Sequence, residues 1–480
     1  MPGIFIDFEG DIILINILPY EKVDVLSKYK ELIDELEVIK FTGYVERIVG
    51  LTIESVGPSV KYGDLCKIKT GQSQYLYAEV VGFNRNRVIL MPIGDMKGVV
   101  PGAEVYAAGT GLMVPVGKEL IGRVVSGIGK PLDGRGDIFT RVKYPVEGRE
   151  HNPLDRRVIT EPLSVGIRSI DGLITVGRGQ RIGIFAGSGV GKSTIIGMMA
   201  RYTDADVNVV ALIGERGKEV KDFVEKELGP DGLKRSVVVA ATSDQPPMIR
   251  LRGAFLAHSI AEYFRDQGMA VNLLMDSVTR FAMAQREVGL AAGEPSATRG
   301  YPPSVFTMMP KLLERAGTDS SGGSITGFYS VLVEGDDMNE PIADAARGIL
   351  DGHIVLDRKF ANRGHYPAVD VLASISRCMK DVADERHIRA ANIFRELLAA
   401  YTDAEDLINL GGYVRGANPL VDRAISMIGE MNVFLKQGIY EEDNLASIRD
   451  RLMSMMIPED KKVKTTAPVT RAPSFAQVLR

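Results

Sequence analysis

Tryptophan is absent from this 480-residue chain, and cysteine and histidine are scarce, with two and five residues respectively. The two cysteines, Cys66 and Cys378, are far apart in sequence, which excludes a disulfide framework and is typical of a reducing compartment. The histidines show no zinc-ligand spacing; they are His151, His258, His353, His365 and His387. We therefore expect neither a disulfide-stapled fold nor a zinc site.

Long hydrophobic runs are also missing. The longest apolar run near the N-terminus, from Ile12 to Leu18, contains Asn16 and is too short to cross a bilayer. The first residues, MPGIFIDFEGD, are acidic and lack the basic region of a secretory signal. The formal net charge of -4 argues against sequence-independent binding to nucleic acid. We expect a soluble, cytoplasmic protein that binds no nucleic acid; docking onto a membrane complex stays open.

The chain is too long for one ordinary core, and its composition changes along the sequence. Residues 1–40 carry nine Asp or Glu against four Lys, and apolar residues at helical spacing predict an amphipathic helix from about Glu21. This helix either packs on its own protein or binds a partner. Residues 41–113 contain short β-branched runs between glycine turns, which predict a small β-barrel or sandwich.

Residues 114–380 alternate between strand and helix signals. Apolar strands are expected at Val207–Ile213, Val237–Val239 and Val271–Met275, and a helix at Ala254–Arg265. This alternation predicts an α/β, doubly wound and mainly parallel sheet, in which ligands bind beyond the carboxyl ends of the strands. Residues 381–457 predict a helical C-terminal domain, and residues 458–480, which contain three prolines, predict a flexible tail.

The run AGSGVGKS at residues 186–193 fits the phosphate-loop pattern, with alanine in place of the first glycine. It follows an apolar strand and opens a helix, so its backbone N–H groups and the helix dipole are placed to hold phosphate oxygens. Lys192 is expected to reach the β- and γ-phosphates, and the Ser193 hydroxyl to bind Mg²⁺. The residues expected to bind the nucleotide are Gly187, Ser188, Gly189, Val190, Gly191, Lys192, Ser193 and Thr194.

Two acidic residues follow the ends of predicted strands. Glu215, in the run Gly214-Glu215-Arg216, comes directly after a strand and is the candidate for polarising an attacking water; Glu219 is its rival. Asp276 ends another apolar strand, where a carboxylate can hold Mg²⁺ together with Ser193, usually through water. Asp276 could alternatively cap the helix that follows, and both roles can hold together.

Residues 367–377 read PAVDVLASISR. This run resembles the signature of the α and β subunits of rotary ATP synthases and their relatives, and the phosphate loop and Gly214-Glu215-Arg216 match that superfamily in order and spacing. The resemblance extends over nearly the whole chain, from about residue 41 to 457. It implies an N-terminal β-barrel, a central RecA-like phosphate-loop domain with a mainly parallel sheet, and a helical C-terminal domain, with ATP and Mg²⁺ as ligands.

One branch of that superfamily is closest. The run DSVTRFAMAQRE at 276–287, with GEP at 293–295 and RGYPPSVF at 299–306, resembles the flagellum-specific ATPases of bacterial type III export. Ser296 departs from it, since a second proline is expected there. The resemblance implies a homohexamer at the inner-membrane export apparatus, where hydrolysis energises substrate release or unfolding. Residues 1–40 would bind a regulatory or stator protein, and the C-terminal helices a stalk protein and export substrates or chaperones.

The resemblance also implies roles for single residues. Glu215 would be the catalytic carboxylate, and Arg216 would support the phosphate site. Arg377 would be an arginine finger that reaches the neighbouring subunit's nucleotide, where such a group accelerates hydrolysis by ~10³–10⁵. Tyr366 would stack on adenine. From the residues alone, Arg377 could instead pair with a local acid such as Asp370, and Tyr366 could be a core residue.

Other functions remain open. An injectisome ATPase has the same chemistry and a different cargo. A catalytic subunit of a rotary ATP synthase needs a heterologous partner subunit, and the acidic signature expected in its C-terminal helices is not found. An RNA translocase such as the terminator Rho needs exposed aromatic and basic residues on its barrel, and residues 41–113 offer aromatics without a basic–aromatic motif. A purely structural ring conflicts with the set of catalytic residues.

Overall fold

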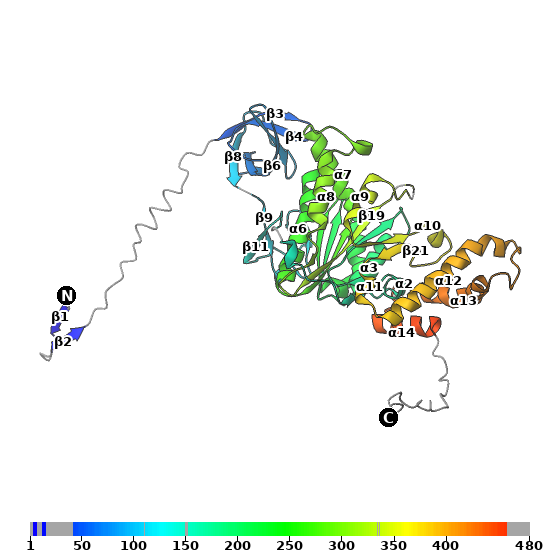
Figure 1. Cartoon of the computed structure of the whole chain (residues 1–480). Coiled ribbons are helices and arrows are strands. Elements are labelled where there is room, and N and C mark those ends of the chain that lie inside the picture. Colours follow the sequence, from blue (N-terminus) through cyan, green and yellow to red (C-terminus); the bar gives the residue numbers. More distant parts are fainter. Residues whose placement is uncertain are drawn as a thin grey trace, which may run out of the picture.

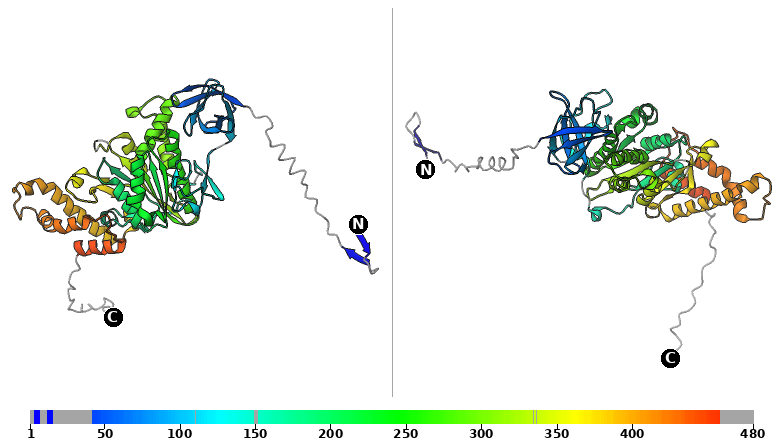
Figure 2. Two further views of the ribbon diagram at one scale, coloured as in Figure 1. Left: turned by 180° about the vertical axis from the view of Figure 1, so that it is seen from behind. Right: turned by 90° about the horizontal axis from the view of Figure 1, so that it is seen from above.

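The structure, a computed structural model, describes two strands at residues 3–6 and 12–15 and then residues 42–109, 111–148, 152–333, 335 and 337–457. The helix expected from about Glu21 and the expected tail at 458–480 lie outside the described residues. A barrel and a group of C-terminal helices lie at opposite ends of a central domain (Figure 1), and two further views agree (Figure 2). No described helix has the length and apolar character that crossing a membrane requires.

Six antiparallel strands after residue 42 close into a barrel in the order β3-β4-β7-β6-β5-β8. They are β3 (Gly43–Val49), β4 (Thr52–Val56), β5 (Leu65–Lys69), β6 (Tyr75–Asn84), β7 (Arg87–Pro92) and β8 (Glu104–Gly109). Ile53, Ile68 and Leu90 fill its interior and are fully buried. The expected barrel is confirmed. Nearer the N-terminus, β1 (Gly3–Ile6) pairs with β2 (Ile12–Ile15) in antiparallel fashion.

The central domain is built on a nine-stranded sheet in the order β10-β16-β15-β17-β19-β14-β20-β21, with β18 paired to β19. Its strands are β10 (Val124–Ser126), β14 (Arg181–Ala186), β15 (Val207–Ile213), β16 (Ser236–Ala241), β17 (Ala270–Asp276), β18 (Gly317–Thr318), β19 (Ser324–Leu332), β20 (Gly352–Leu356) and β21 (Val369–Ser376). Only the pairings of β18 and β21 are antiparallel in this sheet, so the mainly parallel sheet is confirmed. Two small antiparallel pairs flank it, β9 (Met113–Val116) with β11 (Val142–Pro145) and β12 (Pro162–Leu163) with β13 (Val176–Gly177).

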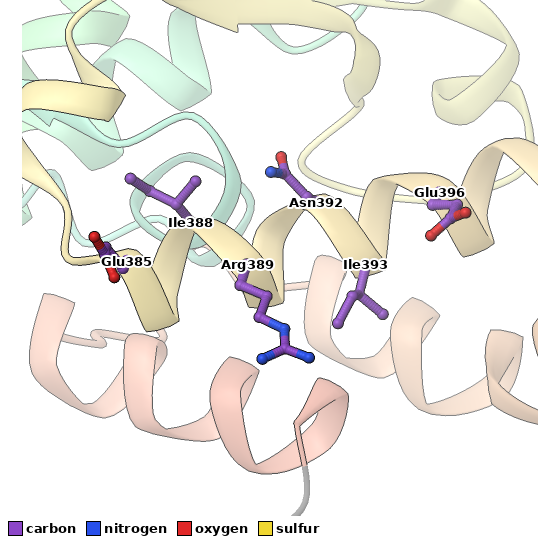
Figure 3. A pocket seen from close by; sticks show the side chains of 6 residues that line it. All are labelled: Glu385, Ile388, Arg389, Asn392, Ile393 and Glu396. Atoms are coloured by element: carbon purple, nitrogen blue, oxygen red, sulfur yellow. The ribbon is translucent and has the colours of Figure 1, made fainter. Parts of the chain in front are cut away.

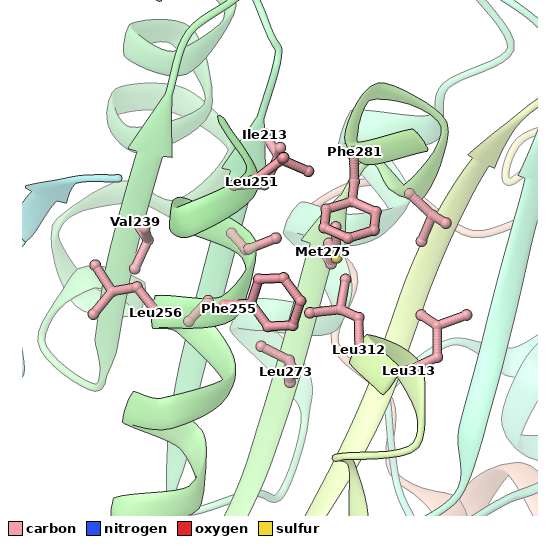
Figure 4. Close-up of a cluster of buried hydrophobic side chains, with 14 of the residues drawn as sticks. Ile213, Val239, Leu251, Phe255, Leu256, Leu273, Met275, Phe281, Leu312 and Leu313 are labelled. Carbon is pink, nitrogen blue, oxygen red and sulfur yellow. The ribbon is translucent and has the colours of Figure 1, made fainter. Parts of the chain in front are cut away.

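Helices cover both faces of this sheet, because its inner strands are buried on both faces. They are α2 (Arg168–Leu173), α3 (Lys192–Tyr202), α4 (Gly217–Asp222), α5 (Gly229–Leu233), α6 (Pro247–Asp266), α7 (Val278–Ala291), α8 (Pro303–Leu313), α9 (Pro341–Ile349) and α10 (Arg358–Asn362), with a π-helix at Phe223–Leu228. In β15, Val209 and Ala211 pack in the cluster of α6, α7 and α8, whereas Val210 and Leu212 pack in the cluster of α3. Figure 4 shows the first cluster, with Phe255 and Phe281 among its buried side chains.

The C-terminal region is helical, as expected: α11 (Met379–Val382), α12 (Glu385–Asn409), α13 (Pro419–Leu435) and α14 (Leu445–Met456). Asp384, Asn418 and Asn444 cap the three long helices, because each side chain accepts a hydrogen bond from a backbone N–H of the first turn. Figure 3 shows a surface depression on this region that is lined by α12 alone. It lies on a different domain from the phosphate loop.

Candidate functional site

The strand register brings several loops to one edge of the sheet. Leu212 of β15 lies opposite Asp276 of β17, and Ala186 of β14 lies opposite Leu332 of β19. These four strands are neighbours and parallel, so the residues that follow them meet at their carboxyl ends. A cavity of about 620 Å³ opens there, lined by the phosphate loop together with residues that follow β15, β17 and β19.

The phosphate loop connects β14 to α3, as its pattern predicts. Gly189 and Gly191 have positive φ angles of 79° and 92°, which an L side chain rarely adopts, so glycine is needed at both positions. The helix begins at Lys192, so its unpaired N–H groups face the cavity. Val190 differs from the other loop residues, because its side chain is buried in the apolar cluster behind the loop and anchors it there.

Lys192 lies between two carboxylates. Its Nζ atom is 2.5 Å from Oδ1 of Asp276 and 3.8 Å from Oε1 of Glu215. Asp276 also accepts a hydrogen bond of 2.7 Å from the Ser330 hydroxyl, so its carboxylate is fixed from two sides. Asp276 does not cap α7; Ser277 does, because its Oγ accepts from the backbone N–H of Arg280. The structure thus brings together three of the residues that the sequence singled out.

Glu215 is in an unusual electrostatic environment. Burial of the carboxyl, reinforced by the Asp276 carboxylate, raises the pKa of Glu215 to about 8. Within the described structure its buried Oε1 atom accepts no hydrogen bond. A buried polar atom without a partner costs free energy unless a ligand or water binds it. A side chain of this kind in a cavity is a candidate for proton transfer.

The rival carboxylate, Glu219, lies in the first turn of α4. Its Oε2 accepts from the Arg216 backbone N–H at 3.5 Å, and a hydrogen bond with Glu215 lowers the pKa of Glu219. Glu219 therefore lines the same cavity beside Glu215 and caps the helix. Lys192 forms its ion pairs with Glu215 and Asp276, which favours Glu215 over Glu219 as the reacting group.

The residues expected to hold Mg²⁺ offer oxygen atoms. Ser193 is exposed in the first turn of α3, and the Asp276 carboxylate lies at the end of β17. No group of three or more His, Cys, Asp or Glu residues that could hold a metal occurs in the part of the chain that the structure describes. This donor set suits Mg²⁺, which takes one or two protein oxygens and completes its shell with water and phosphate. Thr194 lines the cavity, but its hydroxyl donates to Glu227 at 3.3 Å.

Three arginines line the cavity, and only Arg216 was predicted to belong to the site. The Arg216 side chain is 81% exposed and lies 3.9 Å from Glu219, at the rim. Arg280, in the first turn of α7, has a buried Nε atom with no hydrogen-bond partner among the described residues. Arg358 follows β20 and donates to the Ser188 carbonyl at 3.3 Å. The position of Arg358 directly after a strand was the signal that could have identified it.

Tyr366 lies beside the phosphate loop without lining the 620 Å³ cavity itself. A Cβ atom placed on Gly191 would be 3.7 Å from the Tyr366 ring. The ring is 48% exposed, so Tyr366 is not a core residue. Its carbonyl accepts from the backbone N–H of Gln437, which connects it to the C-terminal helices.

Arg377 lies far from the phosphate loop of its own chain. It follows β21, which runs antiparallel to β20. Arg377 therefore lies near the beginning of the parallel strands, whereas the loop lies at their carboxyl ends. The backbone N–H of Arg377 donates to Asp351, whose carboxylate pairs with Arg181 at the start of β14. Asp370 accepts instead from two backbone N–H groups, of Leu372 and Ala373. The exposed Arg377 guanidinium forms no ion pair or hydrogen bond within the described residues.

The fold and the site together define a phosphate-loop nucleoside triphosphatase. Residues 45–109 match the ATP synthase alpha/beta family, beta-barrel domain; residues 166–376 match the nucleotide-binding domain of the same family; residues 383–454 match the T3SS EscN ATPase C-terminal domain. The barrel, the sheet and the terminal helices therefore each correspond to a separate family description.

Individual proteins are similar over most of the chain. The flagellum-specific ATP synthase of Bacillus subtilis is 55% identical over 432 residues, which cover 88% of this chain and 98% of that protein. The type 3 secretion system ATPase of Sinorhizobium fredii is 50% identical over 411 residues, covering 85% of this chain and 90% of that protein. The chain belongs to the ATP synthase alpha/beta family, on the branch of flagellum-specific ATP synthases and type 3 secretion system ATPases.

Two solved structures agree. The assembled ATPase EscN of the enteropathogenic E. coli type III secretion system has a TM-score of 0.82 and 43% identity, covering 86% of this chain and 100% of that chain. EscN in complex with its central stalk EscO has a TM-score of 0.80 and 42% identity, with coverage of 86% and 100%. The family expected from the sequence motifs is thus confirmed.

Proposed function

We propose that this chain hydrolyses Mg-ATP as a homohexameric ring and that hydrolysis drives the release or unfolding, and the export, of flagellar proteins through a type III apparatus. The observation that carries the proposal is the grouping of Lys192, Glu215 and Asp276 at the carboxyl edge of the sheet. Phosphoryl transfer needs a cation that binds the phosphates, a carboxylate that binds the metal and a carboxyl group that orients the attacking water. Lys192, Asp276 and Glu215 supply these groups in that order.

The phosphate loop and the first turn of α3 bind the triphosphate through backbone N–H groups. Lys192 exchanges its partner Asp276 for the β- and γ-phosphates, which frees the Asp276 carboxylate. Ser193 and Asp276 would hold Mg²⁺, with the Asp276 carboxylate oriented by its hydrogen bond from Ser330. When bound, Mg²⁺ neutralises charge on the β- and γ-phosphate oxygens. Tyr366 stacks on the base, beside Gly191.

Glu215 orients the attacking water and accepts its proton. The raised pKa of Glu215 brings this carboxyl near the operating pH, where a general base is most effective. Arg216 and Arg280, which line the cavity on the Glu215 side, stabilise the charge of the γ-phosphoryl group. Lys192 remains on the phosphates and gives the departing oxygen a fixed positive neighbour.

Arg377 completes the site of the neighbouring subunit. The Arg377 side chain is exposed, and its guanidinium has no partner in the described part of the chain. It lies at the end of the parallel strands opposite to the phosphate loop. In a head-to-tail ring, one side of each subunit faces the opposite side of the next subunit. A group on one subunit can therefore complete the site of its neighbour. Each chain has both the base and the finger, so a ring of one subunit type contains complete sites.

The remaining parts of the proposal concern partners and location. By analogy with the EscN–EscO complex, a stalk protein binds in the ring, and the C-terminal helices α12 to α14 face the stalk, export substrates or chaperones. Residues 1–40 bind a regulatory or stator protein. The domain boundaries are residues 41–113 for the barrel, 114–380 for the ATPase domain, 381–457 for the helical domain and 458–480 for a tail. The ring resides in the cytoplasm, bound peripherally to the inner-membrane export apparatus.

Complementation tests the proposal. The purified chain should hydrolyse ATP only with Mg²⁺, form rings of one subunit type, and show a rate that does not change on adding RNA. In a flagellated strain that lacks its own flagellum-specific ATPase, the chain should restore motility, and the Glu215→Gln variant should not. Hydrolysis without any restored motility would reject the flagellar assignment.

An injectisome role is the second candidate, since a type 3 secretion system ATPase is 50% identical to this chain. The same complementation in a strain that lacks its injectisome ATPase separates the two functions. Restored effector secretion, without restored motility, would select the injectisome. A catalytic subunit of a rotary ATP synthase is less favoured, because residues 383–454 match the C-terminal domain of a secretion ATPase.

A further inference from the structure

One face of the phosphate-loop helix α3 contacts Glu227 through two of its side chains, although Arg201 on this face also donates to the Ile439 carbonyl. Thr194, Gly197 and Arg201 lie three and four positions apart, so they share one face of the helix. The Thr194 hydroxyl donates to Oε1 of Glu227 at 3.3 Å, and the Arg201 guanidinium donates to the Glu227 carbonyl. Two polar contacts, one turn or more apart, therefore connect α3 to the same residue.

Gly197 allows this contact. A Cβ atom at Gly197 would lie 2.8 Å from the Glu227 Cβ and 3.1 Å from its Oε2, which is too close for any side chain. Glycine costs stability in the middle of a helix, so its presence here has a packing reason. The reason is the close approach of the segment that carries Glu227.

That segment also carries Glu215. Glu215 and Arg216 lead into α4, and α4 continues without a break into the π-helix Phe223–Leu228 that contains Glu227. Phe223 and Leu228 are buried and anchor the π-helix in the core. π-Helical turns are rare and often occur at functional sites. The segment 215–228 is thus one continuous unit, with Glu215 at its start and Glu227 attached to α3 at its end.

We infer that Glu227 is a positioning residue for hydrolysis: through Thr194 and Arg201 it fixes the segment that carries Glu215 relative to the helix that carries Lys192 and Ser193. The inference rests on the proposed function. Glu227 does not line the 620 Å³ cavity, so it acts through its neighbours and not on the nucleotide. A carboxylate displaced by about 1 Å loses up to ~10²-fold in rate, because the attacking water is then misaligned.

The test compares Glu227→Ala, Glu227→Gln and Thr194→Val with a control variant, Glu225→Ala. Glu225 lies in the same π-helix with a 59% exposed side chain and pairs with Lys221 at the surface. Steady-state and single-turnover ATPase rates, KM for ATP and melting temperature are measured on the full chain. Glu227→Ala should lower kcat by ~10–100-fold and leave KM within about twofold, since binding contacts are intact.

Three further results are expected. Glu227→Gln retains an acceptor for Thr194 and should keep most of the rate. Thr194→Val removes the donor without changing size and should lower kcat in the same direction as Glu227→Ala. The double variant should be no slower than Glu227→Ala alone, because both changes remove one interaction.

The inference is overturned if Glu227→Ala retains the rate of Glu225→Ala, if only KM changes, or if the effects of Thr194→Val and Glu227→Ala multiply. If Glu227→Ala does not fold, Thr194→Val decides alone: an unchanged kcat overturns the inference. Glu215→Gln separates this inference from the proposed function. Full turnover by Glu215→Gln rejects the catalytic mechanism of the proposed function, whereas an impaired Glu215→Gln with a fully active Glu227→Ala rejects only the inference.

Discussion

Arg377 and Lys192 lie at opposite ends of the parallel strands of one β-sheet. Lys192 follows the carboxyl end of β14, whereas Arg377 is bonded through Asp351 to Arg181, at the beginning of that strand. At the rise of a β-strand, the six residues of β14 separate its two ends by about 17 Å. An arginine side chain cannot span that distance. A site that uses both residues therefore needs two copies of the chain.

Because we propose Glu215 as the general base, hydrolysis should depend on its carboxyl group. The Glu215→Gln variant keeps the shape of the side chain and removes its ability to accept a proton, so kcat should fall by about 10²–10⁴-fold. ATP binding, measured with a fluorescent nucleotide analogue, should be retained because Lys192 and the loop are intact. Full turnover by Glu215→Gln would reject this assignment.

The pH dependence of the rate should report the raised pKa of Glu215, about 8. Below this pH the carboxyl is protonated and cannot accept a proton, so kcat/KM should rise as the pH increases toward 8 and then level off. A kcat/KM that is flat from about pH 6 to 8 would contradict a general base with this pKa.

The Ser330 hydroxyl orients the Asp276 carboxylate, so Ser330→Ala should weaken Mg²⁺ binding. The Mg²⁺ concentration for half-maximal activity should rise by ~10-fold, within the range found when partners of metal ligands are removed. Asp276→Asn should have a larger effect, because it removes the negative charge. Ser324→Ala, at the other end of the same strand, is the control and should not change the Mg²⁺ requirement. Equal Mg²⁺ curves for Ser330→Ala and the control would contradict the metal assignment.

Stacking by Tyr366 should be visible in the affinity for ATP. Tyr366→Ala removes the ring beside Gly191 and should raise KM for ATP by about 5–150-fold, since stacking of a base on an aromatic ring contributes ~1–3 kcal/mol. Tyr366→Phe keeps the ring and should behave like the unmodified protein. If the alanine and phenylalanine variants have the same KM, Tyr366 does not stack on the base.

The strands and the first acidic residues of the site could be predicted from local sequence. The strand β15 has the expected bounds Val207–Ile213, because a fully buried parallel strand is a nearly continuous apolar run, interrupted here only by Asn208. Glu215, Asp276 and the phosphate loop meet because parallel strands end at one edge, a rule that needs only their order in the chain. Strand β8 is hard to recognise from the sequence, because Val105 is its only buried residue and its alternation is weak.

The rest of the site depends on packing that no local pattern contains. Arg280 reaches the cavity from the first turn of α7 because Gly214 leaves room for it: a Cβ on Gly214 would lie 2.6 Å from the Arg280 Cβ. The Thr194 hydroxyl is directed away from the cavity to Glu227, which is 33 residues further along the chain. Such contacts depend on how two helices approach each other, and the sequence of either helix alone does not determine that.

The sharing of sites between subunits is tested most directly by mixing two inactive variants. Arg377→Ala chains have an intact Glu215, and Glu215→Gln chains have an intact Arg377. In random one-to-one rings about a quarter of the interfaces combine the two intact groups in the productive order. The control mixture combines Glu215→Gln with the double variant Glu215→Gln/Arg377→Ala, which cannot build a complete site.

The sharing of sites predicts that ATPase activity, absent from each variant alone and from the control mixture, returns when Arg377→Ala and Glu215→Gln chains are assembled into the same rings. Absence of activity in rings verified to contain both chains would contradict it.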